Sequence, residues 1–279
     1  MKMKNLFIDP LYEDKHYQAD QSFVSMNSHG SKIFGVMYTA QGIAKHPTMI
    51  LLHGFPGTER NFDLAHAFRR AGWNTFVFHY RGSWGSHGVF SFHNVLEDVK
   101  VALEFIRSKD SIEKYHIDID NIALFGHSMG GFASLMTACE DINIKACIAV
   151  APYNLGEVGN LIKKDNDQMD IAKNMFEECI VPLNVANVDI LFDEMITNNK
   201  IWNLNDKVSQ FSENNVLLIA GSRDADATPE IHYQPLVEAF SLNKKANFEN
   251  YLIDSGHSFQ DKRIELTEII GDWLERKLP

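Results

Sequence analysis

The sequence has few cysteines, no long apolar run and no excess of positive charge. The three cysteines are an odd number without CxxC spacing, so neither a disulfide framework nor a zinc knuckle is expected. Cys139 and Cys147 lie in apolar surroundings and are expected to be small core residues. No stretch reaches the length of a membrane-spanning helix, and residues 1–18 carry charges without the apolar stretch of a signal peptide. We therefore expect a cytoplasmic protein with no membrane partner.

Basic residues are fewer than acidic ones, with 26 lysines and arginines against 37 aspartates and glutamates, so the formal net charge is −11. A negative chain is repelled by the phosphate backbone, so no nucleic-acid partner is expected. The length of 279 residues and the 45% hydrophobic content suit one large single-core domain, or a core with a modest insertion. The sequence makes no prediction of the oligomeric state.

Strands and helices are predicted to alternate along most of the chain. Residues 1–20 form an irregular arm, and a hairpin follows with strands at 21–27 and 32–39 around a turn at 28–31. Further strands are predicted at 48–52, 75–80, 121–125, 146–150, 216–220 and 248–253, and helices at 59–71, 92–108, 132–138 and 261–277. Buried strands that alternate with helices indicate an α/β fold with a mostly parallel sheet and helices on both faces.

The alternation breaks between residues 153 and 214, where the chain is polar and has helical pieces at 169–178 and 188–197 but no convincing strand. We interpret 153–214 as a helical cap inserted over the carboxyl edge of the sheet, and 1–152 with 215–279 as the core. Aromatic side chains in the cap either line an acyl pocket or pack the cap onto the core, and we favour packing. They are Phe176, Phe192 and Trp202.

The most informative motif is Gly-His-Ser-Met-Gly-Gly at 126–131, which matches the G-x-S-x-G nucleophile elbow. So short a pattern recurs by chance, and a plain Gly-Ser turn is the alternative. Here an apolar strand ends just before the motif and a helix begins just after it, which is the setting that the elbow needs. Gly126 and Gly130 have no Cβ to clash in so tight a turn. The sequence therefore predicts Ser128 as a nucleophile.

A serine hydroxyl needs a base, and the base needs a carboxylate. His257 lies in a loop between the last predicted strand and the last helix, at the edge of the sheet where the elbow also ends. Asp224 and Asp226 follow the preceding strand, so the three residue types come in the order Ser, Asp, His, which is the order that accompanies the G-x-S-x-G elbow. We predict His257 as the base and prefer Asp224 over Asp226 as the acid, because of its spacing from the strand end.

An oxyanion hole requires two N–H donors. The backbone N–H of Met129 should be one, because this residue follows the nucleophile. The other should come from His-Gly-Phe-Pro-Gly at 53–57, which on its own would be an ordinary turn. Phe55 is the predicted donor, since Pro56 has no N–H.

Taken together, these segments make the chain resemble α/β-hydrolases of the type that includes bacterial esterases, with feruloyl and cinnamoyl esterases among them. The catalytic domains of prolyl oligopeptidase-like serine peptidases are of the same type. The matching segments are HGFPGT (53–58), YRGSWGS (80–86), GHSMGG (126–131), GSRDADATP (221–229) and DSGHSF (254–259). The resemblance covers residues 21–152 and 215–279.

The resemblance implies the α/β-hydrolase fold and a site that needs no cofactor. It gives the roles of nucleophile, acid and base to Ser128, Asp224 and His257, and the roles of oxyanion donors to Phe55 and Met129. The acid loop is one residue longer than the commoner D-x-x-V-P pattern, so Asp226 stays open as the acid. No β-propeller precedes the core, and the insertion matches no cap that we can name.

Three functions remain open at this stage. The first is hydrolysis of small or medium carboxylic esters through an acyl-enzyme. The second is a peptidase acting on short peptides or acyl-amino acids, which would need a charged group to hold a peptide terminus. Candidate carboxylates in the cap are Glu177, Glu178, Asp193 and Glu194. The third is a noncatalytic binding protein on a hydrolase fold.

Other polar residues are expected to be structural. Arg81 should bond backbone or a carboxylate, His53 should support the oxyanion loop, and His127 should point away from the reacting atoms. No metal is predicted, because three further histidines lack the spacing of a metal motif. They are His79, His87 and His93.

Overall fold

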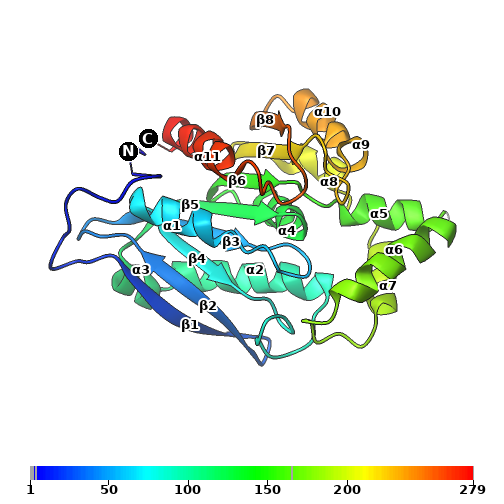
Figure 1. The fold of residues 1–279 in the computed structure, drawn as a ribbon, viewed down its shortest axis with the longest axis horizontal. Coiled ribbons are helices and arrows are strands. Elements are labelled where there is room, and N and C mark those ends of the chain that lie inside the picture. The colour runs from blue at the N-terminus through cyan, green and yellow to red at the C-terminus, as the bar shows by residue number, and fades with distance from the viewer. Residues whose placement is uncertain (1–2, 4, 165, 279) are drawn as a thin grey trace.

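The computed structural model describes residue 3 and residues 5–164 and 166–278, and an eight-stranded sheet runs through its centre (Figure 1). Neighbouring strands follow the order β1-β2-β4-β3-β5-β6-β7-β8. The strands are β1 (Asp20–Ser28), β2 (Ser31–Thr39), β3 (His46–Leu52), β4 (Asn74–Phe78), β5 (Ile117–His127), β6 (Ile144–Val150), β7 (Asn215–Gly221) and β8 (Asn247–Ile253). This arrangement confirms the predicted α/β-hydrolase fold.

The sheet is parallel from β4 through β8, and the hairpin of β1 and β2 adds antiparallel pairs at one edge. His29 and Gly30 connect the hairpin with φ of 47° and 85°. Two consecutive positive φ values are what a two-residue turn matched to the twist of its strands requires. The predicted hairpin is therefore confirmed.

Helices cover both faces of the sheet. They are α1 (Phe62–Arg70), α2 (Phe92–Arg107), α3 (Lys109–Tyr115), α4 (Met129–Ala138), α5 (Leu155–Ile162), α6 (Asn166–Cys179), α7 (Val188–Thr197), α8 (Leu204–Lys207), α9 (Pro229–His232), α10 (Gln234–Leu242) and α11 (Arg263–Lys277), with a 3₁₀ turn at Val208–Gln210. α1 and α11 lie on one face, and α2, α4 and α10 on the other (Figure 1). Among the helices described, none is long and apolar enough to cross a bilayer.

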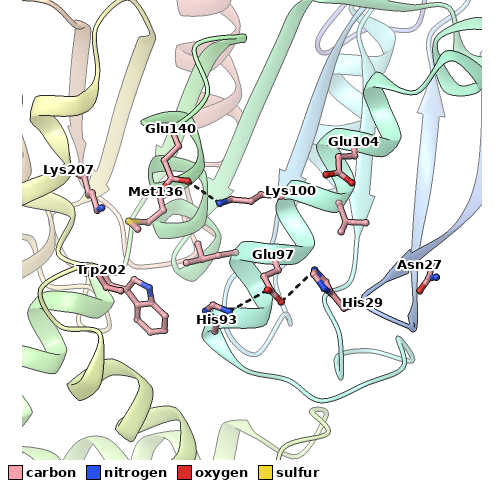
Figure 2. Close-up of a pocket in the computed structure, with 13 residues that line it drawn as sticks. Asn27, His29, His93, Glu97, Lys100, Glu104, Met136, Glu140, Trp202 and Lys207 are labelled. Atoms are coloured by element: carbon pink, nitrogen blue, oxygen red, sulfur yellow. Dashed lines mark hydrogen bonds and ion pairs between the residues drawn. The ribbon is translucent and has the colours of Figure 1, made fainter.

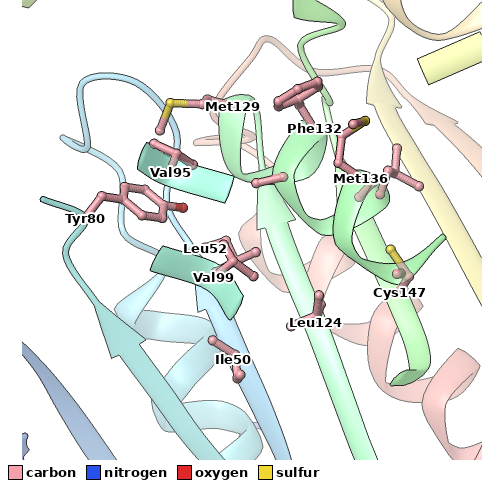
Figure 3. Packing of buried hydrophobic residues seen from close by; sticks show 14 of the residues in the cluster. Ile50, Leu52, Tyr80, Val95, Val99, Leu124, Met129, Phe132, Met136 and Cys147 are labelled. Atoms are coloured by element: carbon pink, nitrogen blue, oxygen red, sulfur yellow. The ribbon is translucent and has the colours of Figure 1, made fainter. Parts of the chain in front are cut away.

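Alternate residues of each central strand supply two separate hydrophobic cores. In β3, Met49 and Leu51 pack with α1 and α11, whereas Ile50 and Leu52 pack with α2 and α4 (Figure 3). All four are essentially unexposed. Burying such a side chain stabilises the fold by about 1.5–3 kcal/mol. Because both faces are covered, the strand is apolar at successive positions, which is the pattern that identified it in the sequence.

Some element boundaries differ from the prediction. The helix predicted from residue 59 begins at Phe62, because Asn61 has a left-handed backbone with φ of 57°. The strand predicted to end at Tyr80 ends at Phe78. Helices α3 and α10 were not predicted: α3 has seven residues, and α10 has Pro235 in its first turn. A proline there is compatible with a helix, since that N–H has no intrahelical partner.

The segment between β6 and β7 contains four helices, α5 to α8, and α5, α6 and α7 extend beyond the end of the sheet (Figure 1). Among its described residues, the one isolated β-bridge to another segment pairs Leu183 with Ser83 in antiparallel orientation. Asn184 continues this contact, since its N–H donates to Gly82 O at 2.7 Å and its carbonyl accepts from Phe90 N at 2.9 Å. The segment coincides with the predicted cap, whose division from the core stays a prediction.

Candidate active site

Ser128 stands in a strained turn between β5 and α4. Its φ of 57° and ψ of −120° lie in a region that non-glycine residues rarely adopt. A Cβ on Gly126 would overlap the Gly130 carbonyl, and a Cβ on Gly130 would overlap the Leu52 carbonyl at the end of β3. These close approaches explain why both positions are glycine. They hold the turn against the sheet and present the serine at the carboxyl end of the strands.

His257 and Asp224 are joined by a hydrogen bond of 2.8 Å between Nδ1 and Oδ2. The other oxygen of Asp224 accepts the N–H groups of Asp226 and Ala227 at 2.9 and 2.8 Å. Asp224 is 4% exposed, and these donors stabilise its buried carboxylate. Of the two acids left open by the sequence, Asp224 is the one that bonds the histidine, and Asp226 instead helps to orient Asp224 through its backbone.

His127 supports the loop that carries His257. Its Nε2–H donates to the His257 carbonyl at 2.8 Å, and the two rings lie 4.8 Å apart. Burial lowers the pKa of His127 to about 3, so the imidazole is neutral at pH 7. The hydrogen bond gives His127 a role in positioning the histidine loop, and its orientation away from the reacting atoms stays a prediction.

Ser128 and His257 line the same cavity of about 470 Å³. One wall is apolar and comes mainly from α5 and α6, with Phe92 beside them. Its residues are Leu155, Val158, Leu161, Ile162, Ala172 and Phe176. The polar lining residues include Asp226 and His257, which belong to the loops after β7 and β8. The hydroxyl of Ser128 has no hydrogen bond to any residue that the structure describes, and catalytic bonds of this kind often tighten only with substrate.

The cap aromatics divide between the two roles that the sequence left open. Phe176 lines the cavity and stacks on Phe55, with ring centroids 4.7 Å apart. Phe192 packs edge-on against Phe176 at 5.2 Å and is 1% exposed, and Trp202 is 3% exposed in the core. Phe176 therefore shapes the cavity, whereas the other two pack the cap onto the core.

The loop after β3 is held from several sides. Trp84 Nε1 donates to Pro56 O at 2.7 Å, and the Tyr80 hydroxyl donates to His53 O at 3.1 Å. His53 is buried beneath the loop, as expected of a supporting residue, and the peptide bond between Phe55 and Pro56 is cis. Gly54 lies against Ser128, where an added Cβ would come within 2.9 Å of the serine Cβ.

Two backbone N–H groups near Ser128 are available as donors. Those of Phe55 and Met129 donate to no residue in the described parts of the chain. Both residues line the cavity with the serine. Unsatisfied donors that converge on a nucleophile are what an oxyanion hole requires.

Arg81 has a structural role, as expected. Its Nε lies 2.7 Å from Asp98 Oδ1, its backbone N–H donates to Asp98 Oδ2 at 2.7 Å, and its NH2 lies 2.6 Å from Glu97 Oε2. Asp98 is unexposed and also accepts from Ser28 Oγ at 2.5 Å. This network ties the loop after β4 to α2 and to the hairpin.

A second and larger hollow, about 640 Å³, lies over α2 and α4 (Figure 2). Glu97 sits between His93 and His29 at 3.4 and 3.8 Å, and Lys100 pairs with Glu140 at 3.0 Å. No serine, threonine or cysteine is among the described residues that line it. Exposed ion pairs of this kind contribute little energy, and the hollow lacks a hydroxyl or thiol nucleophile among its described lining residues.

Asp224, Asp226 and His257 bring ligand atoms within 4.8 Å of one another, the one such cluster found in the described part of the chain. His257 Nδ1 is already bonded to Asp224, so a cation there would compete with that bond. The prediction that the site needs no metal stays a prediction.

Among the cavity residues that were not predicted from the sequence are the polar residues Tyr153 and His232. Tyr153 follows β6, and its N–H donates to Ser128 O at 3.1 Å. Its ring stacks on His232 with centroids 4.5 Å apart and an interplanar angle of 27°. Tyr153 could have been suspected from its place just after a strand that ends beside the elbow. His232 carries no signal of its own in the sequence.

The family follows from comparison with known proteins. The model of a family described as serine aminopeptidase, S33, matches residues 44–243, which includes the elbow and the Asp224 loop. The chain belongs to the serine aminopeptidase S33 family. It thus has the α/β-hydrolase fold, and the resemblance inferred from its motifs is confirmed.

Relatives of this S33 chain match it over part of their length. The quorum-quenching protein AidA of Acinetobacter baumannii is 30% identical over 139 residues, which are 48% of this chain and 44% of AidA. A putative esterase/lipase 2 of Mycoplasma genitalium is 27% identical over 132 residues, 46% of each protein. The match spans less than half the length of these relatives.

Solved structures share the fold of this S33 chain over nearly its whole length. The Pyrococcus furiosus esterase Pf2001 has a TM-score of 0.68 at 19% identity and covers 98% of both chains. Est1E of Butyrivibrio proteoclasticus, solved with ferulic acid bound, has a TM-score of 0.70 at 18% identity and covers 91% of this chain and 99% of its own. At these identities the likeness shows the fold alone.

The stability of this S33 chain should depend on its buried histidines. Burial lowers the pKa of His53 and His127 from 6.5 to about 3 and that of His232 to about 4. Below about pH 6.5 the unfolded chain binds protons at these residues and the folded chain does not, so the free energy of unfolding falls as the pH falls. We expect Tm to change little between pH 8 and 7 and to drop by several degrees per unit between pH 6.5 and 5.

Circular dichroism melts across this pH range test the expectation, with His232→Asn as the comparison. Removing one buried imidazole should make the drop in Tm shallower below pH 6.5. A Tm that stays level from pH 7 to 5 would contradict the prediction.

Proposed function

We propose that the chain cleaves small or medium carboxylic esters through an acyl-enzyme intermediate, with Ser128 as nucleophile, His257 as base and Asp224 as acid. The observation that carries the proposal is a strained serine in one cavity with a histidine that a buried aspartate orients. This combination has no structural purpose that we can identify. The apolar wall from α5 and α6 fits the acyl part of an ester.

The proposed reaction has two halves, acylation of Ser128 and hydrolysis of the acyl-enzyme, and each half uses the same groups. His257 Nε2 takes the hydroxyl proton as Ser128 Oγ attacks the carbonyl carbon, and the N–H groups of Phe55 and Met129 hold the resulting oxyanion. The protonated histidine, stabilised by Asp224, gives its proton to the leaving alcohol. Water then repeats the attack on the acyl-enzyme and releases the acid. No cofactor takes part.

A peptidase that holds a free amino terminus is the second candidate, and the description of the family supports it. The cap carboxylates that the sequence suggested do not line the cavity: Glu194, for example, accepts the Phe92 N–H at 2.7 Å at the start of α2. Asp226 and Glu59 do line it, and either could pair with an ammonium group. The large share of apolar lining that α5 and α6 supply favours the esterase.

A substrate panel distinguishes the two candidates. We expect wild-type protein to hydrolyse p-nitrophenyl esters from acetate to octanoate, with kcat/KM highest at intermediate chain length because the cavity holds about 470 Å³. Aminoacyl p-nitroanilides, which carry a free amino group, should be hydrolysed at least about 100-fold more slowly, a difference of about 2.7 kcal/mol in the barrier. Faster turnover of the anilides than of the esters would favour the peptidase.

A further inference from the structure

His232 is a buried polar residue in the cavity wall, and the proposed reaction does not use it. It lies at the end of α9, is 4% exposed and faces the cavity that Ser128 and His257 line. Tyr153 stacks on its ring and fixes the plane of the imidazole.

The hydrogen bonds of His232 determine which of its nitrogens carries a proton. Nδ1 accepts the backbone N–H of Asn154 at 2.9 Å, so Nδ1 is unprotonated. The proton of the neutral ring is therefore on Nε2. Nε2 has no hydrogen-bond partner among the described residues, and it is not one of the enclosed atoms left without a partner. His232 thus offers one fixed N–H donor to the cavity.

Two further polar residues line the same cavity, and one of them, Tyr153, stacks on the His232 ring. The Tyr153 hydroxyl makes no hydrogen bond with a described residue, and the nearby Asp226 carboxylate contributes to raising the pKa of Tyr153, after burial, to about 12. The Asp226 carboxylate is exposed and accepts no hydrogen bond in the described parts of the chain. The three side chains bring a donor, a hydroxyl and an acceptor to the lining of one cavity.

Only some substrate groups match such a set. A carboxylate can only accept hydrogen bonds, and it would be repelled by Asp226, with no lysine or arginine among the described lining residues. An ammonium group can only donate, so it would leave the His232 N–H unpaired. A hydroxyl accepts from His232 Nε2–H and donates to Asp226, which satisfies both.

We infer that His232, Tyr153 and Asp226 form a subsite for a hydroxyl group on the alcohol part of the ester, an inference that rests on the proposed esterase function. The alcohol part is assigned to this wall because His257 must protonate the leaving oxygen, and ligand atoms of Asp226 and His257 lie within 4.8 Å. The acyl part then occupies the apolar lining that α5 and α6 supply. The preferred substrate class is the ester of an apolar acid with a hydroxylated alcohol.

The test compares 2-hydroxyethyl hexanoate with n-propyl hexanoate, which have equal numbers of heavy atoms and the same acyl group. For wild-type protein we expect kcat/KM to favour the hydroxyethyl ester by about tenfold, the effect of one hydrogen bond in a desolvated site. His232→Asn keeps an acceptor for the Asn154 N–H and removes the Nε2 donor, so the preference should fall to about one. His66→Asn, outside the cavity, should leave both activities unchanged.

Four results would decide against the subsite. Equal kcat/KM values for the two esters in wild type, or a preference that His232→Asn retains, would overturn it while the esterase proposal stands. If His232→Asn does not fold, Tyr153→Phe decides, because it removes a hydroxyl and keeps the ring, and an unchanged preference there overturns the subsite. Wild-type protein that hydrolyses neither ester nor p-nitrophenyl hexanoate overturns the proposed function and this inference together.

Discussion

Replacing Ser128 with alanine should lower kcat for p-nitrophenyl hexanoate by about 10⁵-fold, because it removes the proposed nucleophile. Alanine fits the position with the loss of a single oxygen atom, so Tm should stay close to that of wild type. Steady-state kinetics and a thermal melt of the same preparation measure the two quantities. Loss of activity with an unchanged Tm separates chemistry from folding.

Ser258 provides the matched control, because it lines the same cavity one residue after His257. Ser258→Ala should retain kcat within about tenfold of wild type, because the hydroxyl has no part in bond making. A fluorophosphonate probe should label wild-type protein and Ser258→Ala, and leave Ser128→Ala unlabelled. Labelling of Ser128→Ala would identify a different nucleophile, and unlabelled wild type would favour a noncatalytic protein.

Replacing Asp224 with asparagine should have the second largest effect, lowering kcat by about 10³–10⁴-fold. In the proposed reaction the carboxylate, 2.8 Å from Nδ1, holds the proton of His257 on that nitrogen, and its charge stabilises the imidazolium formed during attack. An amide in the same place can present its NH2 to Nδ1 and so favours the wrong tautomer. The kcat of the variant on p-nitrophenyl hexanoate measures the effect.

Asp226→Asn is the control variant for the kcat measurement on Asp224→Asn. Asp226 is two residues away and contributes only its backbone N–H to Asp224, so its substitution should lower kcat by less than about tenfold on an unhydroxylated ester. If the larger loss followed Asp226→Asn, that residue would be the acid. Small losses in both variants would exclude either carboxylate as the partner of the base.

The fold could be predicted from the sequence because its central strands are buried on both sides. The run Thr48–Leu52 is apolar without a break, and the glycines at 126 and 130 mark a close approach that few other turns require. Short elements escaped prediction for a related reason. Helix α3 has only two fully buried residues, so its sequence carries little of the helical pattern.

The candidate site was predictable to the extent that local sequence encodes it. Ser128, His257 and Asp224 each follow a strand in a recognisable order, so their convergence could be inferred from topology. The choice of Asp224 over Asp226 depends on which carboxylate bonds His257, and only the folded loops show this. His232 is held in the cavity wall by a hydrogen bond from Asn154, which is 78 positions away. Such a distant contact leaves no pattern in the local sequence.

The cavity draws its two walls from different stretches of the chain, and this has a consequence for how such proteins diverge. The apolar wall comes from α5 and α6, whereas the proposed reacting residues come from loops of the sheet. Substitutions in the two helices can therefore change which acyl group fits without displacing a reacting atom. Descendants of one ancestral gene can acquire new substrates through changes in a short stretch of sequence while the reaction itself is inherited intact.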